Sequence, residues 1–372
     1  MVRDGVVIYS VQVRPYRLPL RAAVRTAHGV LTAREGALVR LEDPATGRAG
    51  LGEASPLPGF GTETADGVES ALRTMDEKAT AEQLADLIAR AGCAGFAVES
   101  ALKEIRREGE KIPALTGGGT AETLPVAALL PAGRAALGKI AALGEAGFRT
   151  FKWKVGVAPA GEELPLLDDV CAALPPGARL RLDANGAWDR RAAERWLERC
   201  AERPVELVEQ PCLAGPGAGA ADLARTEDLL RGLAADFPVR IALDESLAGP
   251  GDVDRWLAAD WRGVWVIKLG LLGGAALEKL SRARADLVFS SALETAVGAR
   301  AALRAAFAWN AARTQRAGSK ASGGSPTPPR ALGFGVWPLF ADARFDGPHL
   351  APFLRARDVD TINVEAAWSA LS

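Results

Sequence analysis

The sequence predicts an α/β protein in which a parallel β/α barrel follows a smaller α+β domain. From about residue 122 onward, eight short apolar runs alternate with amphipathic helical stretches, which is the pattern of such a barrel. The part before it has strands first and helices after, as in α+β domains. The 372 residues also exceed the roughly 250–300 at which a single hydrophobic core stops growing, so two domains are expected.

The first domain is expected to begin with strands. Residues 6–13 and 37–42 alternate apolar and polar side chains, which indicates two strands. The segment 25–30 between them is polar and contains glycine, as hairpin loops do. Residues from about 63 to 109 are rich in alanine and predict helices.

The barrel prediction depends on the eight apolar runs. They cover residues 124–130, 150–157, 179–184, 205–210, 240–243, 263–269, 287–291 and 332–337. A doubly wound sheet is the structural alternative, but it would be expected to carry a glycine-rich nucleotide loop after its first strand. The first run is followed instead by Pro131-Ala132-Gly133-Arg134, which favours the barrel.

Two segments interrupt the alternation of strands and helices. Residues 313–330 are polar and rich in glycine, serine, proline and threonine, which predicts a flexible surface loop in the last β/α unit. Residues 215–221 are a second insert of small residues. We expect both to lie at the surface.

Composition excludes several classes of protein. The chain has 45 basic and 46 acidic residues, a net charge of −1, which does not predict a nucleic-acid surface. No uncharged apolar run reaches the roughly 18 residues needed to span a bilayer. The four cysteines form no close pairs and no metal-finger spacing, so they predict buried free thiols. With no apolar signal segment at Met1, we expect a cytoplasmic protein.

Charged and polar residues follow the apolar runs, where barrel enzymes place catalysis. Period-two alternation puts two lysines on the inner face of the second run and Trp153 on the outer face. Along the chain, these polar residues are Lys152, Lys154, Asp183, Asn185, Glu209, Asp244, Glu245, Lys268, Ser290, Ser291 and Glu294. They are expected to converge at one mouth of the barrel.

The order of these groups indicates proton chemistry beside a metal ion. Three carboxylates on successive strands offer hard oxygen ligands that suit Mg²⁺ or Mn²⁺. Lysines on opposite sides can remove a proton next to a substrate carboxylate while the cation neutralises the charge that develops. Each group alone has a structural explanation: a turn at Asp183, a helix cap at Asp244, a solvated lysine at a strand end. The joint order favours catalysis.

The order resembles that of the enolase superfamily, in its muconate-lactonizing branch. This resemblance implies a TIM-type (β/α)7β barrel over residues 119–343, with an α+β capping domain built from residues 1–118 and the tail 344–372. It implies Asp183, Glu209 and Asp244 as metal ligands, Lys154 as general base and Lys268 on the opposite face. It further assigns Lys152 to tuning Lys154, Asn185 to contact with substrate or ligands, and Glu245 to a place beside the third ligand.

A narrower signature lies in the seventh run. Ser290-Ser291-Ala292-Leu293-Glu294 and the closing 331–335 segment resemble the o-succinylbenzoate synthases, whose serines and adjoining amides hold a succinyl carboxylate. The small-molecule carboxylate substrate would be 2-succinyl-6-hydroxy-2,4-cyclohexadiene-1-carboxylate, dehydrated to o-succinylbenzoate in menaquinone biosynthesis. The hairpin at 26–34 would cover the site, with His28 as either a substrate contact or a solvated loop residue.

Two other functions compete with this dehydration. A racemase or epimerase of N-acylamino acids, such as N-succinylamino acids, would use the same metal and both lysines. A dipeptide epimerase would be expected to carry Asp-x-Asp on its last strand, and Gly333-Phe334-Gly335-Val336 has none. A non-enzymatic binding protein on a retired barrel is disfavoured, because all five charged groups are kept.

Overall fold

A computed structural model describes residues 7–26, 29–57, 59–90, 92–107, 123–215, 217–318 and 328–372. Its first part is an antiparallel sheet with the strand order β3-β2-β1-β4. The sheet consists of β1 (Ile8–Thr26), β2 (Gly29–Asp43), β3 (Arg48–Ala54) and β4 (Lys78–Thr80). The two predicted strands are confirmed but are longer than their alternating runs, and β3 and β4 were not predicted. His28 lies outside the described residues.

Three helices cover one face of this sheet: α1 (Ala65–Arg73), α2 (Ala81–Arg90) and α3 (Cys93–Arg107). Helix α3 lies directly on β3, and two glycines permit the contact. A β-carbon on Gly50 would lie 2.1 Å from the Ala101 carbonyl oxygen, and one on Gly52 would lie 1.8 Å from the Ala97 carbonyl oxygen. The predicted helical region is therefore confirmed except where β4 interrupts it.

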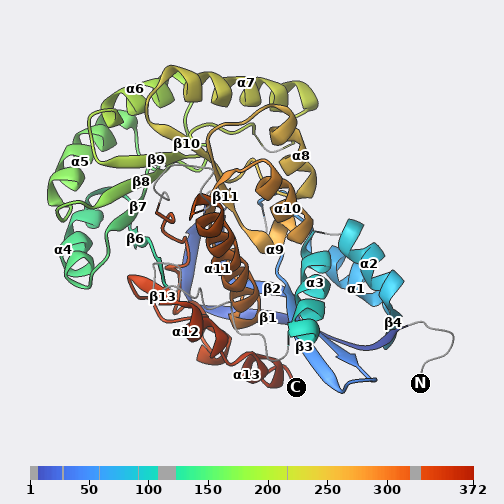
Figure 1. The fold of residues 1–372 in the computed structure, drawn as a ribbon. Coiled ribbons are helices and arrows are strands. Elements are labelled where there is room, and N and C mark those ends of the chain that lie inside the picture. Colours follow the sequence, from blue (N-terminus) through green and yellow to red (C-terminus); the bar gives the residue numbers. More distant parts are fainter. Residues whose placement is uncertain are drawn as a thin grey trace.

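The second part is a curved parallel sheet in the order β12-β11-β10-β9-β8-β7-β6, with helices along its outside (Figure 1). Its strands are β6 (Ala128–Leu130), β7 (Thr150–Lys154), β8 (Arg179–Asp183), β9 (Val205–Glu209), β10 (Arg240–Leu243), β11 (Val264–Ile267) and β12 (Asp286–Phe289). Its helices are η2 (Gly133–Ala136), α4 (Leu137–Glu145), α5 (Ala160–Ala173), α6 (Arg190–Cys200), α7 (Ala220–Asp236), α8 (Pro250–Ala258), α9 (Leu269–Leu272), α10 (Gly274–Arg282) and α11 (Ala296–Gly318).

Two residues of the last predicted run close the sheet into a barrel. Leu332 bridges to Val126 and Gly333 bridges to Ser290, both in parallel orientation. The predicted barrel with an eighth strand is thus confirmed, but that strand is reduced to bridges, and residues 334–337 form a turn.

The first predicted run, 124–130, divides between two partners. Its beginning is β5 (Thr123–Pro125), which pairs with β13 (Phe353–Arg355) near the end of the chain. The change of partner follows Pro125, which has no N–H. The Val126 amide still donates to the Pro352 carbonyl of the tail, but the Ala127 amide donates to the Leu332 carbonyl of the closing strand. The prediction of one barrel strand over the whole run was therefore wrong.

The loop predicted at 313–330 begins later than expected. Helix α11 continues to Gly318, because its polar residues bond back along the helix: Thr314 donates to the Asn310 carbonyl and Arg316 to that of Ala312. At the other end, Arg330 lies outside any helix or strand, as predicted, but it is anchored by ion pairs with Asp286 and Glu206. Residues 319–327 lie outside the described part.

The first sheet docks on the barrel through β1 and through the tail. Pro19 and Arg21 exchange backbone hydrogen bonds with residues 339–341, which follow the closing strand. The tail contains η3 (Ala343–Phe345), α12 (Ala356–Asp360) and α13 (Val364–Ser369). Within it, Trp368 lies 3.9 Å beneath the Arg14 guanidinium, and Glu365 accepts from Arg40. No helix in the described ranges has the length and apolar content needed to cross a membrane.

Candidate active site

Alternation along the barrel strands brings the predicted site residues to one mouth. In each of these strands, the residue two positions before the site residue faces the barrel interior. Arg181 stands two positions before Asp183, and Leu207 stands two positions before Glu209. The same spacing holds for Ala242 and Asp244, for Val266 and Lys268, and for Val288 and Ser290. Leu207, Ala242, Val264, Val266 and Val288 form one buried cluster inside the barrel. Because side chains in a strand alternate, the next inward position at the carboxyl end is the functional one.

A cavity of about 260 Å³ opens at this mouth. Its polar wall consists of Lys152, Lys154, Asp183, Asn185, Asp244, Glu245, Lys268, Ser290 and Ser291. Its apolar wall consists of Leu57, Phe60, Leu129, Leu130, Leu293, Gly333 and Val336. Leu57 and Phe60 come from the N-terminal part, so both parts of the chain enclose the cavity.

Lys152 joins two of the predicted metal ligands. Its ammonium lies 2.8 Å from Asp183 and 2.7 Å from Glu209. Burial lowers the pKa of Lys152, but the carboxylates of Asp183, Glu209 and Asp244 outweigh it, so the pKa lies above its ordinary value. Burial raises the pKa of Glu209 well above its usual range, although Lys152 opposes this. Lys152 therefore remains an ammonium.

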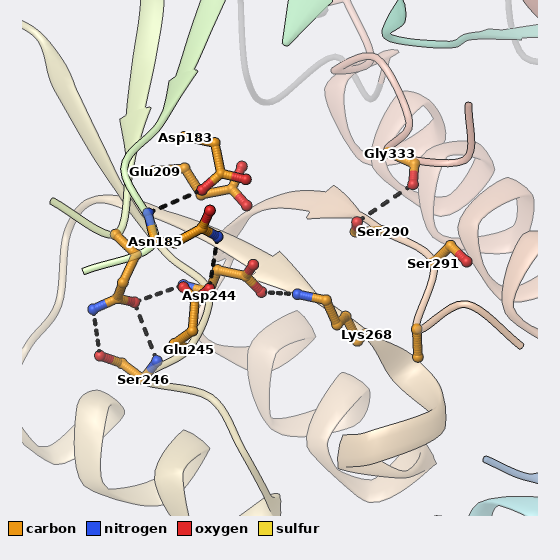
Figure 2. A network of polar contacts seen from close by, with 12 residues as sticks. Asp183, Asn185, Glu209, Asp244, Glu245, Ser246, Lys268, Ser290, Ser291 and Gly333 are labelled. Carbon is orange, nitrogen blue, oxygen red and sulfur yellow. Dashed lines mark hydrogen bonds and ion pairs between the residues drawn. The ribbon is translucent and has the colours of Figure 1, made fainter. Parts of the chain in front are cut away.

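The third carboxylate, Asp244, is in contact with Lys268 (Figure 2). Burial alone would raise the pKa of Asp244, but Lys268 and Lys152 hold it below its ordinary value. On its other side, the Lys268 ammonium lies 4.4 Å from the centre of the Phe60 ring. A residue of the N-terminal part thus lies against this lysine through a cation–π contact.

Carboxyl groups outnumber ammonium groups around these residues. Glu245 adds a fourth carboxylate, and burial together with Asp244 and Asp183 raises its pKa to about 7. Asn185 donates to Glu245 over 2.8 Å, yet Asn185 Oδ1 and Glu245 Oε2 are both buried without a hydrogen-bond partner. Four carboxylates with two contacting ammonium groups, and unpartnered oxygens beside them, fit a divalent cation.

The described residues do not already form a metal cage. No three acidic, histidine or cysteine side chains in the described ranges are gathered closely enough to hold an ion. Lys152 lies between Asp183 and Glu209, and Lys268 contacts Asp244. Figure 2 shows Asp183 and Glu209 side by side at the ends of adjacent strands, with Asp244 on the next strand. The three carboxylates are oxygen ligands of the kind that Mg²⁺ prefers, and they lie at the ends of three adjacent strands, so they could hold this ion even though they are not gathered around one point here.

Gln210 fixes the backbone around the third carboxylate. Its Oε1 accepts from the amides of Asp244 and Ser246, and its Nε2 donates to Ser246 Oγ and the Cys212 carbonyl. Gln210 has a φ of 37°, in the left-handed region that non-glycine residues rarely adopt. Such strain persists where surrounding bonds enforce it. Here the hydrogen bonds from Gln210 to the amides of Asp244 and Ser246 fix the end of β10 so that Asp244 faces the cavity.

Lys154 differs from the other two lysines. It lines the cavity, and among the described residues its ammonium has no hydrogen bond or ion pair. The loop after it is fixed by the buried Glu163 carboxylate, which accepts from the amides of Gly156, Val157 and Ala158. Behind the strand, Trp153 faces outward as predicted and packs edge-on against Trp196 at 6.3 Å. Lys154 is therefore held by its backbone while its ammonium faces the cavity.

The two serines after β12 have different surroundings. Ser290 is half-buried, and its hydroxyl has only a long contact of 3.4 Å to the Gly333 carbonyl. Ser291 is buried, donates to Glu294 over 3.0 Å and accepts from the Leu293 amide. The amides of Ser290 and Ser291 are bonded to the carbonyls of Ile267 and Gly333. Only the Ser290 hydroxyl is thus available to the cavity without breaking a short bond.

Comparison with known proteins identifies the family. The model for "MenC, N-terminal domain" matches residues 8–105, and the model for "Enolase C-terminal domain-like" matches residues 136–319. An o-succinylbenzoate synthase of Thermosynechococcus vestitus is 36% identical, over 87% of this chain and 92% of its own. The chain belongs to the o-succinylbenzoate synthase family of the enolase superfamily.

Other members and neighbours agree with this assignment. An o-succinylbenzoate synthase of Thermobifida fusca is 31% identical, over 77% of this chain and 73% of its own. The solved structure of the Thermosynechococcus elongatus o-succinylbenzoate synthase, described as complexed with Mg in the active site, is 34% identical with a TM-score of 0.76, covering 97% of this chain and 99% of that one. Muconate lactonizing enzyme from Pseudomonas fluorescens, at 24% identity and a TM-score of 0.66, shares the fold over 81% of this chain and 85% of its own.

Several residues around this o-succinylbenzoate synthase family site were not predicted. Phe60 and Glu163 lie in stretches that show no strand-end pattern. Gln210 was visible in the sequence only as the neighbour of Glu209. Glu294 was expected at the mouth, but it is buried beside Ser291 and does not line the cavity. Their roles depend on contacts between elements, which the spacing of residues along the chain does not reveal.

Glu294 carries a testable pH effect. Burial, with a smaller contribution from Glu53, raises its pKa from 4.5 to about 7, so the folded state holds this proton more tightly than the unfolded state. Its stabilising contribution is therefore complete below pH 4.5 and is lost as pH rises through about 7. Glu294→Gln, which does not titrate, should gain stability over wild type across this window, by up to roughly 3 kcal/mol. Urea unfolding at pH 5 and pH 8 measures the change, and parallel pH curves for the two proteins would contradict it.

Proposed function

We propose that this chain acts as an o-succinylbenzoate synthase. It dehydrates 2-succinyl-6-hydroxy-2,4-cyclohexadiene-1-carboxylate to o-succinylbenzoate in menaquinone biosynthesis. The observation that carries the proposal is the pair Lys154 and Lys268 on one cavity, next to carboxylates from three adjacent strand ends. The lysines stand four strands apart in an eight-membered barrel, so they face the substrate from opposite walls.

Asp183, Glu209 and Asp244 are the proposed ligands of a divalent cation, Mg²⁺ with Mn²⁺ as the alternative. When bound, the cation supplies positive charge beside the ring carboxylate of the substrate. Asn185 and Glu245 bond to each other behind the ligands. The excess of buried carboxylate over ammonium described above supports this assignment.

Lys154 is the proposed general base. Its ammonium is not held by a carboxylate of the described residues, whereas those of Lys152 and Lys268 are, so it can turn toward the substrate. As an amine, Lys154 takes the proton from the ring carbon next to the carboxylate. The bond between the neighbouring ring carbon and its hydroxyl then breaks, Lys154 returns the proton to the departing hydroxyl, and water leaves the aromatic ring. Lys152, two residues away, stays charged between Asp183 and Glu209.

Lys268 is proposed to remain protonated throughout. Its ammonium is held between Asp244 and the Phe60 ring. From that position it stabilises negative charge on the opposite face of the substrate without exchanging a proton. The succinyl arm extends toward Ser290 and Leu293, where the Ser290 hydroxyl can donate to its carboxylate.

Exchanging Ser290 for alanine is expected to raise KM about tenfold with little change in kcat. It removes one hydrogen bond to a charged acceptor, worth roughly 1.5–3 kcal/mol, at a distance from the reacting carbon. Ser291→Ala breaks two bonds within the loop, so it should also lower the melting temperature. Steady-state kinetics and calorimetry on both variants measure this, and unchanged kinetics in both would place the succinyl carboxylate elsewhere.

The direct test is an assay with the cyclohexadiene substrate, in which appearance of the aromatic product is followed by absorbance with and without Mg²⁺. A panel of N-succinylamino acids is assayed in parallel for racemisation, the alternative use of the same site. Turnover of the cyclohexadiene with metal dependence is expected. Racemisation without dehydration would overturn the proposal.

A further inference from the structure

The end of the loop between β12 and α11, together with the first turn of α11 (residues 291–298 in all), is held from behind by two charged residues of the N-terminal sheet. Arg34 on β2 is completely buried. Its guanidinium donates to the carbonyls of Leu293 at 3.1 Å and Ala292 at 3.3 Å. Its remaining bonds go to Ser55 and to the Pro56 carbonyl in its own domain. Arg34 therefore ties the first half of this loop to the N-terminal sheet.

Glu53 on β3 holds the other half of the loop. Its carboxylate accepts from the Thr295 amide at 2.9 Å, the Thr295 hydroxyl at 2.5 Å and the Gly298 amide at 2.8 Å. These amides lie at the start of α11, where a carboxylate satisfies free N–H groups and the helix dipole. Tyr16 donates to the same carboxylate at 2.6 Å. A β-carbon on Gly298 would lie 2.9 Å from Glu294 Cγ and 3.0 Å from Glu53 Oε2, so a larger residue there would displace these side chains.

The loop is in a strained conformation that needs such support. Leu293 has a φ of 60°, in the left-handed region that a bulky side chain rarely adopts. Its carbonyl is the one that Arg34 holds, and its side chain lines the cavity beside Ser290. Conformations of this kind persist where neighbouring groups enforce them. Without Arg34, we expect the loop to relax and the cavity wall beside Ser290 to change shape.

We propose that Arg34 and Glu53 are positioning residues for the distal, succinyl carboxylate of the substrate. Arg34 fixes the carbonyls and Glu53 the amides of the same loop, so together they set where Leu293 and Ser290 present their side chains. Neither residue lines the cavity. This inference rests on the proposed function, which places the succinyl arm at this wall.

A general role in domain docking is the competing explanation, and the chain supplies a matched control. Glu104 on α3 also joins the N-terminal part to α11, through Arg300 and Arg304, and accepts from the Leu51 amide. It contacts the body of the helix and not the loop. A docking defect alone should therefore affect Glu104→Gln and Glu53→Gln alike.

The experiment compares two ligands on each protein in the presence of Mg²⁺. One is o-succinylbenzoate, and the other is 2-butanoylbenzoate, in which a methyl group replaces the distal carboxylate. Wild type is expected to prefer o-succinylbenzoate. Arg34→Lys and Glu53→Gln should each reduce this preference by about tenfold, roughly the value of one hydrogen bond to a charged group. Their affinity for 2-butanoylbenzoate should stay unchanged, and Glu104→Gln should keep the full preference.

The two ligands are titrated separately into the same preparation of each protein. Any unfolded fraction therefore changes both apparent affinities by the same factor and cancels in their ratio. Variants at Arg34 and Glu53 that keep the wild-type preference would overturn the inference while leaving the proposed function intact. An equal preference loss in Glu104→Gln would overturn it as well, in favour of docking. Failure of wild type to bind o-succinylbenzoate would overturn the proposed function together with the inference.

Discussion

Lys154→Arg is expected to lower kcat for dehydration by about 10²–10⁴, the usual contribution of a positioned general base. Arginine keeps the positive charge but cannot act as a base at neutral pH. Lys268→Arg should retain measurable dehydration, because that lysine supplies charge and no proton. Stopped-flow or steady-state absorbance on the cyclohexadiene substrate compares the two variants. An inactive Lys268→Arg beside an active Lys154→Arg would reverse the assignment of the base.

Isotope exchange separates the two lysines further. In racemisation, the alternative reaction of this site, both lysines act as bases, so wild-type protein given an N-succinylamino acid in heavy water would exchange the α proton of either enantiomer. Lys268→Arg should exchange only the enantiomer whose proton faces Lys154. The control is the opposite variant, Lys154→Arg, which should exchange only the other enantiomer. NMR of the recovered amino acids reads the result without any dependence on dehydration.

Glu209→Gln is expected to abolish dehydration while the chain stays folded. The substitution removes one of three proposed ligands and a partner of Lys152, yet it also removes a carboxylate from a buried cluster with excess negative charge. The apo protein should therefore be as stable as wild type or more so. Mg²⁺ titration by calorimetry should show the loss of metal affinity directly.

The same strand supplies the control for this experiment. Glu206 lies at the opposite end of β9, where it pairs with Arg181 and Arg330. Glu206→Gln should lower stability and leave kcat nearly unchanged. If Glu209→Gln turned over at the wild-type rate, or if the chelated wild-type enzyme did so, the proposed metal site would be wrong.

The barrel and its charged mouth were predictable because both follow from local rules. Strand alternation places Asp183, Glu209 and Asp244 on one inward face, and apolar runs mark the strands that carry them. The barrel strands after the first fall within the predicted runs, except that β12 begins one residue earlier, at Asp286. The apolar pattern does not reveal where a segment changes its pairing partner. Pro125 is an example, because its strand pairs with the distant tail.

The supports of the site were not predictable for a different reason. Arg34 and Glu53 occupy positions in alternating strands where a charged residue ordinarily faces water. Both are buried because a segment 242 to 259 residues later supplies carbonyls and amides for them. Sequence spacing records contacts within an element, whereas the fate of a buried charge depends on what packs against it. Their position thus became apparent only with the tertiary structure.

The pairing of β5 with β13 has a consequence for how the protein forms during synthesis. Residues 123–125 directly precede the first barrel strand, and their partners at 353–355 are synthesised about 230 residues later. Trp368, which lies under Arg14, emerges later still. Chains with contacts of such long sequence separation fold slowly and expose unpaired strands meanwhile. A nascent chain therefore carries an open edge until residues 353–355 have been synthesised, and a chain that stops before residue 353 should depend on chaperones.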